Sequence, residues 1–559
     1  MSDAGVDPAT LEVVRNAVVA AAEEMNATLI RTSYSPNIKE RRDCSCAVFD
    51  AAGRMVAQAE NIPVHLGAMP ASVAAAVEAH PPETLAPGDA VLVNDPYHGG
   101  AHLPDLTLIS PVFHDGSVVA FAANRAHHAD IGGATPGGVG ADSTSIYQEG
   151  LRIPPVKLYE GGELNGDVRS LITTNVRTPD ERRGDLQAQQ AANETARRRL
   201  TDLVAEHGAD RLDALFAEIL AYSERRMRGA VADLPNGEFA YTDHLDGDGV
   251  TGDPVAISAT VRIDGETVAI DFAGTDDQVA GPVNAPRAVT VSASYYCLRC
   301  VTDHTIPPNE GCYRPLELAI PEGSVLNATP PAPVVGGNLE TSQRTVDVVL
   351  GAFAEADIER VPAAGQGTMN NVTFGGDGPG GAYTFYETQA GGFGGRAGAD
   401  GMDGVHVHMS NTMNTPVEVL ERAYPLEVAR YEFRPDSGGA GEFRGGLGLR
   451  RDIRPVGHDA SVSLLADRQR SRPYGLAGGE PGASGAVYLL DDDGERRLDG
   501  KTALTVAEGE TLSLRTPGGG GYGDPADRDR EAVLADLRDG NLTAAAARER
   551  YGVTDGGDR

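Results

Sequence analysis

The stretch that decides the fold is residues 91–133, VLVNDPYHGGAHLPDLTLISPVFHDGSVVAFAANRAHHADIGG. Two apolar runs, 106–113 and 118–123, flank the turn dipeptide Asp115-Gly116. An Asp-Gly pair between two apolar runs is typical of a β-hairpin. If these two residues are the centre of the turn, position i faces position 231 minus i. The sequence therefore predicts an antiparallel ribbon whose open end carries the polar residues of this stretch.

The open end of this hairpin holds a set of possible metal ligands. The predicted register places Asp105 opposite Ala126 and beside His127, and facing side chains lie about 5 Å apart. His102 precedes Asp105 by three residues. Catalytic metal sites commonly use three protein ligands and leave a position open. We therefore expect His102, Asp105 and His127 to share a divalent cation.

Nitrogen and carboxylate ligands without thiolate suit Mn²⁺, Fe²⁺ or Zn²⁺ better than Ca²⁺. The alternative is that these polar residues only cap the hairpin and bond to loop backbone. Four His lie in residues 102–128 of a chain that has 13 in all, which favours the metal.

Other polar residues of the same stretch are candidates for the chemistry around such an ion. The groups that we expect to transfer protons or face the substrate are His128, His98 and Asp95. The groups that we expect to bind substrate are Asn94, Arg125 and Asp130.

Length and charge exclude some classes of function. A chain of 559 residues is long enough for several domains. Its net charge of −34 would repel phosphates along most approaches, so we expect no nucleic-acid partner. The excess of Asp and Glu over Lys resembles proteins from a salt-loaded cytoplasm, where screening weakens self-repulsion. We therefore hypothesise that the protein is halophilic.

Targeting signals and cysteines point to one compartment. The sequence has no run of about twenty apolar residues and no basic region followed by an apolar one. Its five Cys are few and odd in number, which favours a reducing compartment over a disulfide framework. We expect a cytoplasmic protein without a membrane span.

Periodicity divides the chain into helical and strand-rich parts. Helical spacing covers residues 7–30 and 178–230, the latter with a break near Gly208, and a period of two begins at 236. We predict a mixed α/β (α+β), multi-domain fold whose second half is β-rich and Gly-rich. The expected domains are 1–235 with the hairpin, 236–330 rich in strands, 331–525 rich in glycine, and a helical tail at 526–559.

Several further clusters have two interpretations. The pair Cys44 and Cys46 alternates within an apolar run, which favours burial over metal binding. Lys39, Arg41 and Arg42 either meet an anionic substrate or form a solvated turn, and the turn is favoured. His65, ahead of a small-residue helix, either faces the metal loop or is a satisfied core residue. Cys297, Cys300, His304 and Cys312 lack a second paired knuckle, so ordinary burial is favoured over structural zinc.

The second half adds two candidate groups. Asn338, Glu340, Ser342 and Arg344 cluster where a buried helix is expected to begin, near Thr341, and a helix N-terminus is a natural anion site. His406 and His408 alternate on what reads as one strand face, so they either bind metal or are buried strand residues.

Two glycine motifs resemble nucleotide-binding sites, but neither lies between the secondary-structure elements that such a site requires. Residues 494–502, GERRLDGKT, have one residue too many for a P-loop and lie in an expected hairpin turn. Residues 518–523 satisfy G-x-G-x-x-G, but a C-terminal helix at about 526–538 follows and no βαβ unit does. The sequence therefore predicts no nucleotide site in this chain.

Long motifs identify a family resemblance. The segments NDPYHGGAHLPDLTLISPVF, NRAHHADIGG, NIPVHLGAMP, GGNLETSQRTVDVVLGA and SGGAGEFRGGLG resemble the hydantoinase B family, over about residues 8–553. That family comprises B subunits of ATP-dependent N-methylhydantoinases, the C-terminal half of 5-oxoprolinases, and α subunits of acetone and acetophenone carboxylases. Carried over from the carboxylases, the metal pattern H-x-x-D…H falls on His102, Asp105 and His127.

The resemblance implies a hetero-oligomeric enzyme of two components. A hydantoinase A-like partner would bind ATP and phosphorylate the substrate oxygen, and this chain would complete the chemistry at its metal. We expect a B subunit that opens a cyclic amide, with His128 or His98 assisting proton transfer. The alternatives are an α subunit of an ATP-dependent ketone carboxylase and a non-catalytic scaffold for the A-type partner.

Overall fold

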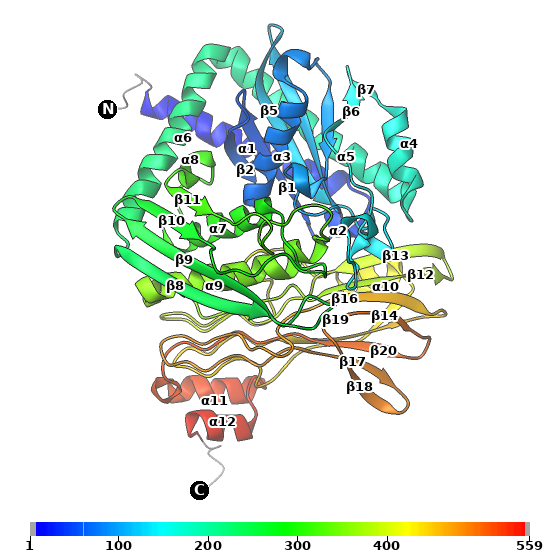
Figure 1. Cartoon of the computed structure of the whole chain (residues 1–559), viewed down its shortest axis with the longest axis vertical. Coiled ribbons are helices and arrows are strands. Elements are labelled where there is room, and N and C mark those ends of the chain that lie inside the picture. Colours follow the sequence, from blue (N-terminus) through cyan, green and yellow to red (C-terminus); the bar gives the residue numbers. More distant parts are fainter. Residues whose placement is uncertain (1–6, 60, 554–559) are drawn as a thin grey trace.

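The computed structural model describes residues 7–59 and 61–553 and shows a mixed α/β architecture (Figure 1). Helices and strands alternate in the first half, and strands dominate the second. The predicted fold class is confirmed. Among the described helices, none is long and apolar enough to cross a membrane.

A seven-stranded sheet forms the centre of the N-terminal half. Its strand order is β2-β1-β5-β4-β3-β6-β7, and every pairing in it is antiparallel. The strands are β1 (Cys44–Asp50), β2 (Met55–Ala59), β3 (Ala90–Val93), β4 (Asp105–His114), β5 (Ser117–His127), β6 (Val156–Glu160) and β7 (Glu163–Leu164). Cys44 and Cys46 are buried under helix α1, as expected.

Helices cover both faces of this sheet. Helix α1 (Pro8–Thr32) begins after the N-cap Asp7, whose side chain accepts the Thr10 amide, and it packs with α5 (Pro179–His207) on one face. Helix α3 (His65–Ala79) packs on the other face. The predicted break at Gly208 is confirmed, and there the chain passes into α6 (Ala209–Ala232). Shorter helices are α2 (Pro36–Lys39), α4 (Gly166–Thr174), α8 (Glu310–Tyr313) and α10 (Val417–Ala423).

The β4–β5 hairpin departs from the predicted register by one residue. His114 faces Ser117 and Phe113 faces Val118, as expected, but Val112 faces Ala120. A β-bulge at this point adds one residue to β5, which shifts every later pair. The predicted pairing of Asp105 with Ala126 is therefore wrong, and Asp105 faces His127 directly.

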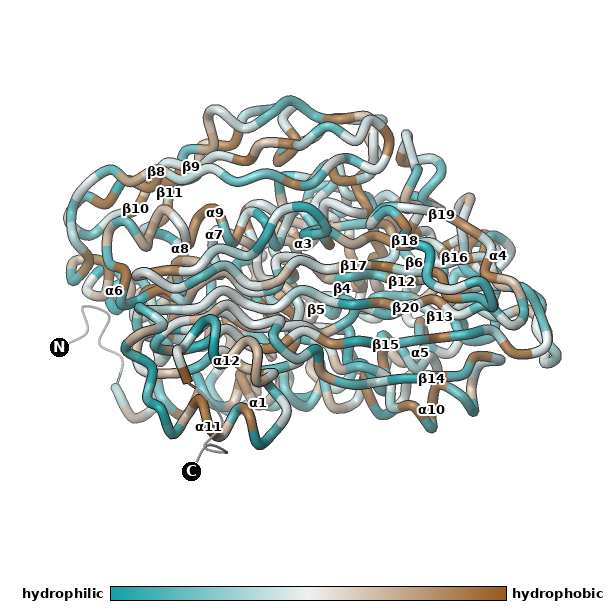
Figure 2. Tube along the Cα trace, turned by 90° about the horizontal axis from the view of Figure 1, so that it is seen from below, coloured by the Kyte–Doolittle hydropathy of each residue, from teal (hydrophilic) through white to brown (hydrophobic). Residues whose placement is uncertain are grey.

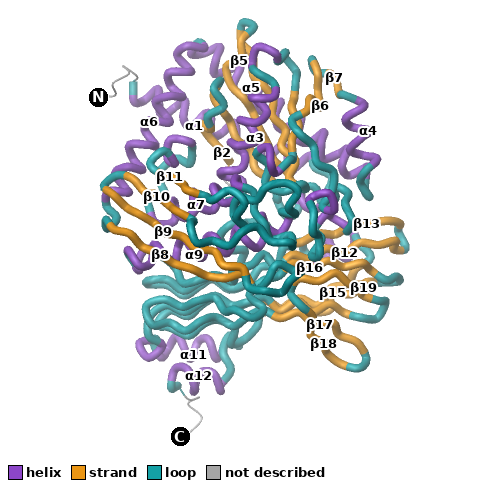
Figure 3. Tube along the Cα trace, in the orientation of Figure 1, coloured by secondary structure: helices purple, strands orange, loops and turns teal. Residues whose placement is uncertain are grey.

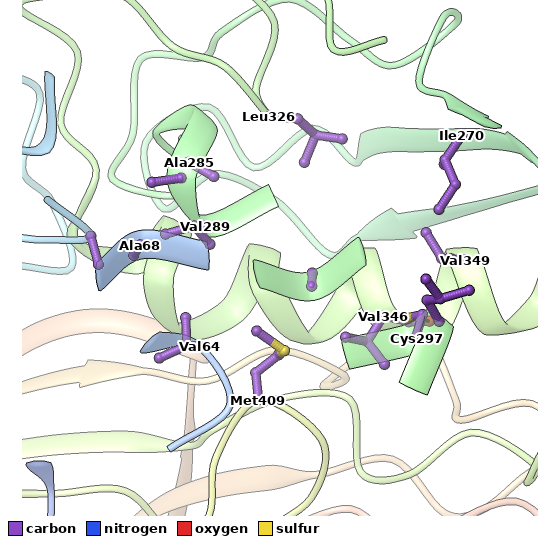
Figure 4. Close-up of a cluster of buried hydrophobic side chains, with 14 of the residues drawn as sticks. Val64, Ala68, Ile270, Ala285, Val289, Cys297, Leu326, Val346, Val349 and Met409 are labelled. Carbon is purple, nitrogen blue, oxygen red and sulfur yellow. Dashed lines mark hydrogen bonds between the residues drawn. The ribbon is translucent and has the colours of Figure 1, made fainter. Parts of the chain in front are cut away.

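A second sheet packs on two buried helices. Its order is β11-β10-β9-β8, with strands β8 (Gly237–Leu245), β9 (Val255–Asp264), β10 (Thr267–Asp271) and β11 (Leu316–Ala319). The helices are α7 (Arg287–Val301) and α9 (Ser342–Ala356). Figure 4 shows Cys297 of α7 among Ile270, Val346 and Val349, in apolar surroundings. One core cluster unites this layer with Phe49 and Ile109 of the first sheet, and the domain boundaries stay predictions.

The C-terminal half contains two further sheets that share one core. Their orders are β13-β12-β16-β19 and β14-β15-β20-β17-β18. The strands are β12 (Asn371–Gly378), β13 (Gly381–Glu387), β14 (Leu426–Phe433), β15 (Leu449–Pro455), β16 (Ala460–Leu465), β17 (Ala486–Asp491), β18 (Gly494–Leu498), β19 (Lys501–Val506) and β20 (Thr511–Arg515). Helices α11 (Arg530–Asp539) and α12 (Ala544–Tyr551) follow. Residues 494–502 thus lie in strands and turns, in agreement with the rejection of a P-loop.

Glycine-rich segments of this half run beside one another without forming strands. Figure 3 shows them as stacked teal lines above α11 and α12, and Figure 2 shows pale, wavy tubes in the same region. Backbone hydrogen bonds link them, such as Gly395 N to Gly520 O at 2.8 Å and Gly446 N to Phe393 O at 2.8 Å. A Cβ on Gly519 would lie 2.0 Å from Phe393 O, so only glycine permits this spacing. We call segments 391–404, 437–448, 475–482 and 517–523 the glycine rows.

Candidate metal centre

The open end of the β4–β5 hairpin brings three side chains together. Asp105 is the first residue of β4, His127 is the last residue of β5, and His102 lies in the loop before β4. His102 Nε2 is 3.0 Å from Asp105 Oδ1 and 3.2 Å from His127 Nδ1, and the last two atoms are 3.2 Å apart. All three residues are buried. Among the described residues, no other group of three or more His, Cys, Asp or Glu side chains is arranged to hold a metal ion.

These separations suit a divalent ion. A point equidistant from three atoms so spaced lies about 1.8 Å from each, which is inside the roughly 2.1 Å bond of such an ion to nitrogen or carboxylate oxygen. The three atoms are therefore close enough together to hold one divalent ion jointly. Asp105 Oδ2 is also buried, and His65 Nε2 lies 3.5 Å from it.

The local electrostatics keep Asp105 ionised. Burial alone would raise the pKa of this carboxyl, but its electrostatic interaction with His102 and hydrogen bonds from His102, His127 and His65 hold it well below its usual range. Burial lowers the pKa of His127, which favours the neutral imidazole. An anionic carboxylate beside a neutral imidazole is the donor chemistry that a divalent ion requires.

Three residues from distant parts of the chain support the trio. His65 Nδ1 lies 2.8 Å from Ser45 Oγ, and its Nε2 lies 3.5 Å from Asp105 Oδ2. The amide of Asn338 lies 3.2 Å from His102 Nε2. The ring of Tyr386 stacks on that of His127 with centroids 4.6 Å apart. His65 faces Asp105, as one of its two interpretations predicted, and it is also buried and hydrogen-bonded, as the other predicted.

A small inner cavity adjoins the trio. Its volume is about 20 Å³, which is room for about one water molecule. Its lining includes Asp105, His127, His65, Asn338 and Ile62. We call this space the inner cavity.

The predicted proton-transfer groups lie outside the inner cavity. His98 is exposed and its Nδ1 lies 2.9 Å from Asp95 Oδ2, while Asp95 accepts the Tyr97 amide and caps a short 3₁₀ turn. His128 is buried, and its Nε2 lies 3.0 Å from Gln189 Oε1. Burial lowers the pKa of His128 to about 4. None of the three lines the inner cavity.

The predicted substrate-binding residues bond to their own surroundings. Asn94 donates to the carbonyls of Leu103 and Leu151. Arg125 is buried and donates to Thr107 Oγ1 and to Ser72 Oγ.

Asp130 accepts both the amide and the guanidinium of Arg177. These contacts fix the loops around the hairpin. A role in substrate binding stays a prediction for Asn94, Arg125 and Asp130.

Several other expectations are corrected by the structure. Arg41 is not in a solvated turn: it is buried and donates to Tyr386 O and Thr388 Oγ1. Arg344 is no anion site, because it pairs with Asp467 at 3.0 Å. The helix there begins with a π turn, Gly337–Thr341, which runs directly into α9.

The pair of histidines in the second half is also corrected. His406 and His408 lie in a loop and not on a strand, and His408 has a positive φ of 49°. His408 Nδ1 lies 3.3 Å from the Tyr296 hydroxyl.

Comparison with known proteins gives consistent matches. The family model described as hydantoinase B/oxoprolinase matches residues 7–525. The B component of a putative D-/L-hydantoinase of Pseudomonas sp. (strain NS671) is 34% identical over 98% of this chain and 95% of its own length. 5-oxoprolinase 1 of Arabidopsis thaliana is 40% identical over 92% of this chain, which spans only 42% of that relative. The crystal structure of an ATP-dependent caprolactamase from Pseudomonas jessenii matches with a TM-score of 0.94 and 34% identity, over 99% of this chain and 98% of its own.

Proposed function

Because the chain belongs to the hydantoinase B/oxoprolinase family, we propose that it is the B component of an ATP-dependent enzyme that opens a cyclic amide. The observation that carries the proposal is the match, over nearly the whole of both chains, to a protein named as the B component of a hydantoinase. The similarity to an ATP-dependent caprolactamase supports a lactam or related ring as substrate.

The proposal includes an A-type partner that binds ATP. The name of the Pseudomonas relative, which makes it one subunit of a larger enzyme, supports a hetero-oligomer. The chain spans only 42% of the length of 5-oxoprolinase 1. The glycine motif at 494–502 lies in strands and turns and offers no alternative ATP site. All five cysteines are free, which supports a reducing cytoplasm as the compartment.

In this proposal His102, Asp105 and His127 hold Mn²⁺, Zn²⁺ or Fe²⁺. When bound, such an ion supplies Lewis acidity and lowers the pKa of water. His65 fixes the second oxygen of Asp105 and takes its own orientation from Ser45. Because it lines the inner cavity, His65 is better placed than His98 or His128 to move a proton at its Nε2.

Reconstitution with an A-type partner tests the proposal. We expect ATP-dependent ring opening of 5-oxoproline, N-methylhydantoin or caprolactam, and its loss on changing His102, Asp105 or His127 to Ala. His114→Ala is the matched control, since His114 is at the other end of the same hairpin. ATP-dependent CO₂ fixation onto a ketone, without ring opening, would instead identify a carboxylase. Unchanged turnover in the three Ala variants would identify a scaffold.

A further inference from the structure

Two larger hollows lie on the same side of the protein as α1 and β2, and one of them adjoins the inner cavity. The outer hollow, of about 670 Å³, is lined by α1, β2 and residues 304–308. The middle hollow, of about 410 Å³, shares Gln58, Asn61 and His304 with the outer one. The middle hollow and the inner cavity share Ile62. The middle hollow therefore adjoins both the outer hollow and the inner cavity, and Ile62 lies between the middle hollow and the cavity that Asp105 and His127 line.

The outer hollow has a charge opposite to that of the protein. The whole chain carries 81 acidic and 47 basic residues. The described lining of the outer hollow, however, has three arginines, Arg15, Arg31 and Arg42, against one carboxylate, Glu23. Arg15 pairs with Glu12, whereas Arg31 and Arg42 form no ion pair with any residue that the structure describes. A concave basic surface on an acidic protein concentrates anions.

An unpaired amide lies where the two hollows meet. Gln58 is 8% exposed and lines both hollows, and its Nε2 is buried with no hydrogen-bond partner among the described residues. A buried donor without a partner is costly, and native proteins seldom retain one without a reason. An acceptor oxygen of a ligand in the hollow would satisfy it.

We propose that the outer and middle hollows form a binding site for a small anion, namely a molecule that carries a phosphate or carboxylate group. Arg31 and Arg42 attract the anionic group, and Gln58 donates to one of its oxygens. If the proposed function is right, the bound anion is the substrate on its way to the metal centre. The anion site itself does not depend on the proposed function.

Titration calorimetry of the full chain with inorganic phosphate, and separately with acetate, tests the site. The double variant Arg31→Gln/Arg42→Gln and the single variant Gln58→Leu should each weaken binding of the preferred anion about tenfold, the scale of one charge-assisted hydrogen bond. The matched control is Arg496→Gln/Arg538→Gln, which removes two exposed arginines that line neither hollow. Its affinity should equal that of the wild type.

Comparing the two anions shows whether the ligand carries a phosphate or a carboxylate group. Tighter binding of phosphate assigns a phosphorylated ligand, and tighter binding of acetate assigns a carboxylate. No binding by the wild type, or equal weakening in the control pair, would overturn the proposal. The measurement needs neither ATP nor turnover, so an inactive reconstituted enzyme would contradict the proposed function and leave the anion site standing.

Discussion

Replacing Asp105 by Asn should abolish ion binding while keeping the hairpin. The amide has nearly the same volume as the carboxylate but no negative charge. Asp105 Oδ1 lies 3.0 Å from His102 Nε2 and 3.2 Å from His127 Nδ1, so it is the single anionic atom of the trio. Changes to residues that only support metal ligands cost 10–100-fold in affinity, so loss of a ligand should cost at least about 100-fold, or about 2.7 kcal/mol.

The same magnitude predicts a shift in melting temperature. A ligand at 100 times its dissociation constant stabilises the folded state by about 2.7 kcal/mol. A chain of 559 residues that unfolds as one unit has an unfolding entropy of about 1.2 kcal/mol/K. Saturating Mn²⁺ should therefore raise the melting temperature of the wild type by about 2 °C, and that of Asp105→Asn by almost nothing. Metal analysis of the purified proteins should show one ion per wild-type chain and none in the variant.

Asp248→Asn is the control for a general effect of losing a buried carboxylate. Asp248 is buried and accepts the backbone amides of Val250, Thr251 and Gly281, away from the trio. This variant should have a lower melting temperature than the wild type, but Mn²⁺ should raise that temperature by the same amount in both proteins. If Asp105→Asn kept its ion and the full gain, the trio would not be the metal site.

Three further predictions concern stability. Gly519→Ala should lower the melting temperature by at least about 2 °C, because its Cβ would lie 2.0 Å from Phe393 O. Gly229→Ala in α6 has open space around its Cβ and should raise the melting temperature slightly. Equal melting temperatures of the two variants would contradict the close packing of the glycine rows. Burial raises the pKa of Glu149 to about 8, so the folded state retains a proton that the unfolded chain releases above about 4.5. The contribution of this group is fully present below pH 4.5 and is lost as the pH rises toward 8, and urea midpoints of Glu149→Gln should decline less over this range than those of the wild type. Molar KCl should raise the urea midpoint by screening the charge of −34, and equal midpoints in low and molar salt would disprove the halophilic hypothesis.

The local part of the site could be predicted from the sequence, because a hairpin places its two ends together. Even so, the predicted register was wrong by one residue. A bulge near Val112 has no strong sequence signal, and it is this bulge that sets Asp105 directly opposite His127. The error did not separate the ligands, since neighbouring residues at a hairpin end remain within reach of one another.

The surroundings of the site could not be predicted, because they come from distant segments. Asn338 lies 236 residues beyond His102 in the chain, and no periodicity reports such a contact. The same holds for Arg41, which donates to Tyr386 and Thr388, more than 340 residues further along the chain. Composition indicated a Gly-rich second half, but not that the glycine rows lie within hydrogen-bonding distance of one another.

The assembly of this centre has a consequence for engineering the chain. His65, the hairpin, Asn338 and Tyr386 line one small cavity, and Ser45 lies 2.8 Å from His65 beside it. A split into two co-expressed fragments anywhere between 46 and 385 would divide the surroundings of the ion between two polypeptides. New termini or an inserted reporter domain belong instead at the exposed tip of the β17–β18 hairpin, residues 491–494, where no part of the centre would be cut.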